Sequence, residues 1–177
     1  MNRPIPDPDS AATDADPSGT DPVARIADYL DFFRGEVRRK TSGLDDAALQ
    51  RVIVPSGWTM PGLVEHLLHM ERRWIVWGFL GEDITAPRAD RDVAGRWVTD
   101  RPLRQILDEL DEMGRRTAAV IADHDPLDHA AVGGKYRQGD PTPTLQAILF
   151  HVFQEYARHA GHLDIVRELV DGLVGED

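Results

Sequence analysis

The sequence contains no cysteine, and this absence removes several kinds of chemistry at once. Structural disulfides, thiolate zinc sites and cysteine nucleophiles all require that side chain. Any sulfur nucleophile that the protein uses must therefore arrive with a bound thiol.

Positive charge is also scarce. The 177 residues include 20 lysines and arginines against 31 aspartates and glutamates, which gives a formal net charge of −11 and a pI near 5.0. A strongly acidic chain repels phosphate backbones and anionic lipid headgroups. We therefore expect neither nucleic acid nor an anionic membrane surface as a partner.

Long apolar runs are missing as well. No stretch approaches the roughly 18 consecutive apolar residues of a membrane span, and the N-terminus lacks the basic-then-apolar order of a signal peptide. The sequence therefore indicates a cytoplasmic protein.

Residues 1–20 differ in composition from the rest of the chain. They are mostly proline, aspartate, serine and alanine, with almost no large apolar side chain. Such a segment buries too little surface to offset the entropy cost of ordering it, so we expect a flexible tail. Residues 21–177 then form one domain, because 41% hydrophobic residues suffice for a sizeable core.

Four segments of this domain place apolar residues at intervals of three or four, as a helix with one buried face does. They are Val23 to Lys40, Thr59 to Gly81, a segment from Asp100–Leu103 to about Ala122, and Thr144 to Asp171. The alternation typical of strands is absent. The pattern predicts an all-α fold, with an antiparallel four-helix bundle as the leading architecture and long linkers that allow a crossover connection.

The last of these helices carries unusual chemistry on its inward face. His151, Glu155, His159 and His162 follow one another at i, i+4, i+8 and i+11 on the stripe that also holds apolar residues. Burying such groups without partners costs several kcal/mol. Two interpretations remain open: a hydrogen-bonded polar seam in a bundle, or a site where a Glu and a His four residues apart hold a divalent cation.

The second predicted helix offers one further candidate ligand. Its apolar stripe comprises Leu63, Leu67, Met70, Trp74 and Trp77. His66 lies at the edge of this stripe, whereas His69 lies further round, beside two arginines. We expect His66 to face inward and the two tryptophans to pack in the core.

The linkers between the helices contain few patterns that indicate ligand binding or catalysis. The segment from Gly81 to Asp92 is a polar connection, and the loop from Asp123 to Pro143 contains Gly133, Gly134 and Lys135. A glycine-rich basic loop can hold an anion, but the spacing of a phosphate-binding loop is missing. We interpret it as a structural turn.

Three motifs together resemble a known family. They are PSGWT at residues 55–59, GLVEHLL at 62–68 with Glu71 and Trp74 following, and EYARHAGHLD at 155–164 with Arg167 and Glu168 following. At this order and separation they resemble the DinB-like metalloprotein superfamily, and most closely its branch of mycothiol-dependent S-transferases. The similarity extends from Asp21 to Gly172.

The resemblance implies a four-helix bundle that holds a divalent metal through His66, Glu155 and His159. Many members have His in place of Glu155, whereas the mycothiol-dependent maleylpyruvate isomerase type is similar to this chain in having Glu. A His/His/Glu set suits zinc with an open fourth position, while nickel, manganese and iron are alternatives. His162 matches the branch motif and is a candidate to orient a ligand; whether it or His151 joins the site stays open.

The implied function is that of a transferase in which the metal binds a low-molecular-weight, mycothiol-like thiol as thiolate, which then attacks an electrophilic carbon. The competing hypothesis is a noncatalytic metal- or ligand-binding bundle, which the same ligands would serve. The His-Glu-x-x-His motif of zinc proteases and the paired Glu-x-x-His of di-iron bundles are both missing. A homodimer is expected from the resemblance alone. The sequence names neither the electrophile, the thiol nor the metal.

Overall fold

The fold is helical throughout the part of the chain that the computed structural model describes, residues 22–87 and 89–174. Its elements are α2 (Pro22–Thr41), α3 (Asp46–Leu49), α4 (Met60–Arg72), the π-helix η1 (Arg73–Phe79), α5 (Leu103–Asp123) and α6 (Leu145–Asp171). Within these ranges no strand forms, and the only β-type pairing is an isolated bridge between His129 and Thr144. The predicted all-α class is confirmed. The expected tail, residues 1–20, lies outside the described residues.

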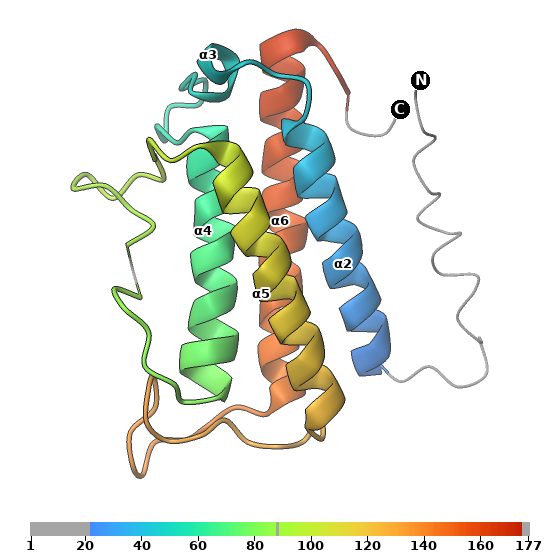
Figure 1. Cartoon of the computed structure of the whole chain (residues 1–177), viewed down its shortest axis with the longest axis vertical. Coiled ribbons are helices and arrows are strands. Elements are labelled where there is room, and N and C mark those ends of the chain that lie inside the picture. Colours follow the sequence, from blue (N-terminus) through green and yellow to red (C-terminus); the bar gives the residue numbers. More distant parts are fainter. Residues whose placement is uncertain (1–21, 88, 175–177) are drawn as a thin grey trace.

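The four long helices surround a common core. Figure 1 shows α2, α4, α5 and α6 side by side, and the main contacts join α2 to α6 and α5, and α4 to α5 and α6. The helices α4 and α6 run in opposite directions, since α4 begins at the end where α6 finishes. Fully buried apolar side chains from all four fill the space between them, among them Leu30, Leu67, Ile106 and Leu149.

The helix boundaries follow the local signals in the sequence. The side chain of Thr59 accepts a hydrogen bond from the backbone N–H of Gly62 at 3.2 Å, which caps α4 as expected. Gly172 adopts φ 80° and ends α6, a left-handed conformation that favours glycine. The predicted positions of the four long helices are confirmed to within a few residues, and no helix of the described ranges is long and apolar enough to cross a membrane.

The end of the second predicted helix departs from expectation. The pattern predicts one α-helix up to Gly81, but Arg73–Phe79 forms a π-helix that continues α4. The glycine-rich loop holds its end: the N–H of Lys135 donates to the carbonyl of Trp77, and the N–H of Gly134 donates to that of Gly81, each at 3.0 Å. A Cβ on Gly134 would lie 2.3 Å from the Trp77 carbonyl oxygen. This close approach explains the glycine and supports the structural role expected of the loop.

The two tryptophans of this region are less buried than predicted. Trp74 is partly buried against the core, and its ring contacts His151, with centroids 4.2 Å apart, and the ammonium of Lys135. Trp77 is half-buried and lies outside the main apolar cluster. The wider turn of a π-helix changes the angular position of each residue, so a stripe drawn with α-helical spacing no longer applies here.

A buried polar network ties the four helices together. Glu71 of α4 is fully buried and accepts hydrogen bonds from Arg34 of α2 (2.5 Å), Thr117 of α5 (2.5 Å) and Tyr156 of α6 (2.6 Å). Burial and the neighbouring carboxylate raise the pKa of Tyr156, which keeps its hydroxyl a donor. Because Tyr156 follows Glu155 in the chain, the network fixes α6 beside α4 at the level of the predicted ligands.

Candidate metal centre

His66 of α4 and Glu155 and His159 of α6 converge between these two helices. One ligand atom from each residue lies within 4.8 Å of the other two. Nε2 of His159 is 3.4 Å from Oε2 of Glu155, and Nε2 of His66 is 4.0 Å from the same oxygen. Both imidazoles are buried, while Glu155 is partly exposed. The structure thus brings together the three residues that the resemblance implied.

The spacing and the donor set fit a divalent cation. A tetrahedral ion with ligands at about 2.0–2.2 Å separates its ligand atoms by about 3.4 Å, close to the observed 3.4 and 4.0 Å. Nε2 of His66 is buried and has no hydrogen-bond partner among the described residues. A buried polar atom without a partner costs about 1–3 kcal/mol, so an ion bound at this nitrogen would remove a penalty that the fold otherwise carries.

His66 is held by a carboxylate from the linker between η1 and α5. Its Nδ1 lies 2.7 Å from Oδ2 of the buried Asp90, whose Oδ1 accepts from Arg73 at 2.8 Å. Burial alone would raise the pKa of Asp90, but the hydrogen bond from His66 and the charge of Arg73 lower it to about 2. The ionised carboxylate therefore accepts from the Nδ1–H of His66, which leaves the Nε2 lone pair facing Glu155 and His159.

Asp90 was not predicted from the sequence. The sequence from Gly81 to Asp92 indicates only a polar connection, because it shows no helical or strand period that assigns a residue to a buried face. Arg73 also donates to the carbonyl of Pro87 at 3.0 Å, so the helix end anchors the linker at two points. Only this tertiary contact makes the aspartate part of the site.

His159 is kept neutral and oriented by its surroundings. Burial, together with the neighbouring imidazole of His66, lowers the pKa of His159 to about 4, so a lone pair is available at neutral pH. Nδ1 of His159 lies 3.2 Å from Nδ1 of His162. With a cation at Nε2, the proton of His159 would lie on Nδ1 and donate to His162, the orienting contact that the motif suggested for this residue.

The remaining histidines of the two helices lie away from the cluster. His151 packs against Trp74 with ring centroids 4.2 Å apart, and burial lowers its pKa. His69 is half-buried. Neither belongs to the group of ligand atoms found in the described part of the chain, so of the two residues left open by the sequence only His162 touches the cluster.

Trp97 covers the centre from the linker side. Its ring stacks on His66 with centroids 4.1 Å apart and planes at 25°, and it meets His159 edge-on at 5.2 Å. The Trp97 carbonyl accepts from the N–H of Thr59 at 3.0 Å, which fixes the backbone against the start of α4. An aromatic cover of this kind lowers the access of water to the cluster. Sequence reasoning missed Trp97 for the same reason as Asp90.

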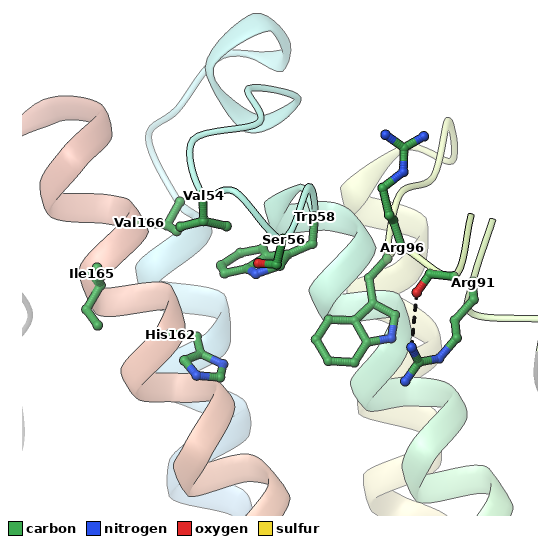
Figure 2. A pocket seen from close by; sticks show the side chains of 10 residues that line it. Val54, Ser56, Trp58, Arg91, Arg96, His162, Ile165 and Val166 are labelled. Carbon is green, nitrogen blue, oxygen red and sulfur yellow. Dashed lines mark hydrogen bonds between the residues drawn. The ribbon is translucent and has the colours of Figure 1, made fainter. Parts of the chain in front are cut away.

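A cavity of about 350 Å³ opens beside the centre. Figure 2 shows His162 on α6 and Trp58 facing the same space, with Arg91 and Arg96 further along the wall. The full lining is Val54, Ser56, Trp58, Arg91, Gly95, Arg96, Trp97, His162, Ile165 and Val166. Trp97 and His162 also contact His66 and His159, so the cavity and the cluster share a wall.

Comparison with known proteins gives one family. The sequence model of a family described as Mycothiol-S-transferase matches residues 25–172. The matched range includes His66, Asp90, Glu155, His159 and His162, and it covers nearly all of the helical part of the chain. No curated protein matches the sequence.

Proposed function

Because the chain belongs to the mycothiol S-transferase family, we propose that it is a metal-dependent transferase acting on a low-molecular-weight thiol of the mycothiol kind. The reaction joins the thiol sulfur to an electrophilic carbon. The observation that carries the proposal is the convergence of His66, Glu155 and His159 within 4.8 Å. The buried Nε2 of His66, which has no partner among the residues described, supports the same reading.

Two imidazoles and one carboxylate favour zinc with an open fourth position, and nickel, manganese and iron accept the same donors. Such an ion would act as a Lewis acid that lowers the pKa of a bound thiol, so that the thiol reacts as thiolate near neutral pH. Since the chain has no cysteine, the reacting sulfur belongs to the cosubstrate.

The chain's own residues supply orientation and a dry surface. Asp90 holds the Nδ1 proton of His66, and His162 accepts that of His159, so both Nε2 lone pairs stay directed at one point. Trp97 shields this point from water, and the cavity beside it gives room for the second substrate.

The proposed reaction needs neither an oxidant nor a reductant. The thiolate electron pair forms the S–C bond, and the leaving group departs with the electron pair of the bond that breaks. For an addition, the π electron pair instead moves to the neighbouring carbon, which takes a proton from solvent. The thiol proton leaves to solvent through the open cavity.

We further propose that the four long helices form the DinB-like bundle, and that the protein acts in the cytoplasm as a homodimer.

The test begins with metal analysis of the purified protein. Metal-loaded protein is then incubated with mycothiol and a panel of electrophiles, with thiol loss and thioether formation followed by mass spectrometry. We expect turnover that chelation abolishes, that His66→Ala removes and that His69→Ala retains. Thioether formation at the background rate with every electrophile, in protein shown to carry metal, would instead support the noncatalytic metal- or ligand-binding bundle.

A further inference from the structure

We infer that the cavity beside the metal centre binds the electrophile through a carboxylate, with Arg91 as the anion-binding side chain. This inference rests on the proposed function and names the class of its second substrate: a small molecule with an apolar body and one carboxylate. The reacting carbon would lie at the end of the cavity near His162 and Trp97, which line it and contact the cluster.

The charge of the cavity is opposite to that of the chain. The protein carries a formal charge of −11, yet Arg91 and Arg96 line the cavity and none of its described lining residues is acidic. A cleft with cationic groups on low-dielectric walls concentrates anions. The local charge thus favours an anionic ligand on an otherwise acidic protein.

The two arginines differ in the partners with which they already interact. The Nε of Arg96 donates to Asp92 at 2.9 Å and its Nη2 lies 2.8 Å from the same carboxylate, so its charge is compensated within the turn. Arg91 donates to the carbonyl of Gly95 at 3.0 Å, the bond drawn in Figure 2, and lies 5.0 Å from the centroid of the Trp97 ring. Among the described residues, Arg91 forms no ion pair with an aspartate or glutamate.

Arg91 is therefore both oriented and available. A guanidinium has five N–H donors in a fixed plane that matches a carboxylate, and the contact with Gly95 uses one of them. The contact with Trp97 restricts the side chain before a ligand arrives, which reduces the entropy lost on binding.

The rest of the cavity fits a small apolar body. Trp58, Ile165 and Val166 supply aromatic and aliphatic surface on the side of the cavity away from the arginines (Figure 2). A volume of about 350 Å³ lies at the small end of the range for ligand sites. A ligand with a carboxylate bound to Arg91 and a short aromatic or alkyl group packed on Trp58 contacts both the cationic and the apolar wall.

Calorimetric titration with benzoate and its neutral analogue benzamide tests the assignment. The full chain is used with chelator present, so that a metal cannot hold the carboxylate. We expect benzoate to bind roughly tenfold or more tightly than benzamide, and Arg91→Met to abolish that difference. Arg91→Lys keeps the charge and should retain part of the preference.

The matched control is Arg104→Met, because Arg104 lines a separate cavity with Arg38 and Arg101. It should leave the benzoate preference unchanged. Equal binding of the two probes, or a preference lost in the Arg104 variant and kept in the Arg91 variant, would overturn the inference.

Kinetics then separate the two substrates. With a carboxylate-bearing electrophile, Arg91→Met should raise KM for the electrophile about tenfold or more and leave KM for the thiol unchanged. A rise in KM for the thiol alone would assign the cavity to the thiol and overturn the inference. Because the titration needs no turnover, it stays decisive if transferase activity is not found.

Discussion

The carbonyl oxygen of Trp97 occupies the space where any side chain at position 62 would begin. A Cβ built on Gly62 would lie 2.1 Å from that oxygen and 2.4 Å from its carbon. The same carbonyl accepts from the N–H of Thr59. The first turn of α4 therefore carries a glycine so that the linker can reach close enough for Trp97 to stack on His66.

Gly62→Ala should displace the linker, because the clash is with backbone that cannot rotate away. We expect a loss of about 1–3 kcal/mol in the free energy of unfolding, as for overpacking elsewhere, together with weaker metal binding. Urea unfolding measures the first effect and metal titration the second. Gly161→Ala on α6 is the matched control, since a Cβ there meets nothing within 4 Å and should be neutral or mildly stabilising. A Gly62 variant as stable as the wild type would contradict the role given to this contact.

Metal should stabilise the protein through the cluster of His66, Glu155 and His159. An ion bound only to the native state adds RT ln(1 + [M]/Kd), about 2.7 kcal/mol at a hundredfold excess over Kd. His66→Ala should remove most of this increment, whereas His69→Ala should retain it. Thermal melts with and without chelator measure it. Chelator-insensitive melts of wild type shown beforehand to carry metal would favour a polar seam.

The residues that orient the ligands should affect the metal affinity although they do not contact the metal. Asp90→Asn keeps an acceptor near Nδ1 of His66 but removes the charge that pairs with Arg73. We expect a fall of about 10–100-fold in metal affinity, measured by competition with a chromogenic chelator. Asp92→Asn, two residues along the same linker and paired with Arg96, should leave the affinity near the wild-type value. Equal effects of the two substitutions would mean a general disturbance of the linker.

His162→Ala tests the second orienting contact. It removes the acceptor that lies 3.2 Å from Nδ1 of His159, so metal affinity should again fall by about 10–100-fold. His162→Gln offers a side-chain oxygen at a similar distance and should restore part of the loss. Affinity unchanged in both variants would show that His159 needs no such partner.

Acid should weaken the protein partly through Glu36 of α2. Burial alone would raise the pKa of Glu36, but the hydrogen bond and charge of Arg39 and the charge of Lys40 hold it below its usual range. A depressed carboxyl pKa adds stability above the unfolded-state pKa, and this contribution is lost as pH falls through the folded-state pKa. Glu36→Gln should therefore cost more stability at pH 6 than at pH 3.5, as measured by urea unfolding. Glu112→Gln, an exposed pair with Arg115, should cost little at either pH.

Residue spacing predicts the helical scaffold and the polar stripe of the last helix, while the set of three ligands followed from the family resemblance. On a helix, spacing alone assigns each residue to a face, so the stripe with Glu155 and His159 could be recognised before any contact was known. The family motif then singled out His66. The structure places these three side chains together.

Asp90, Arg91 and Trp97 belong to a segment without a repeating geometry. Residue spacing in such a segment does not show which side chains face the interior. Their positions depend on contacts distant in sequence, such as the hydrogen bond from Thr59 and the ion pair from Arg73. The π-helix at Arg73–Phe79 was missed for a related reason, because a run of apolar residues does not distinguish it from an α-helix.

The linker between η1 and α5 supplies most of the surroundings of the candidate site. The three candidate ligands are fixed by two long helices, whereas the aromatic cover, the anion-binding arginine and the carboxylate behind His66 all come from residues 90–97. Irregular surface segments accept changes of length and sequence that packed helices do not. A change within this one segment would therefore alter the cover and the wall of the cavity, while the three candidate ligands keep their places on α4 and α6.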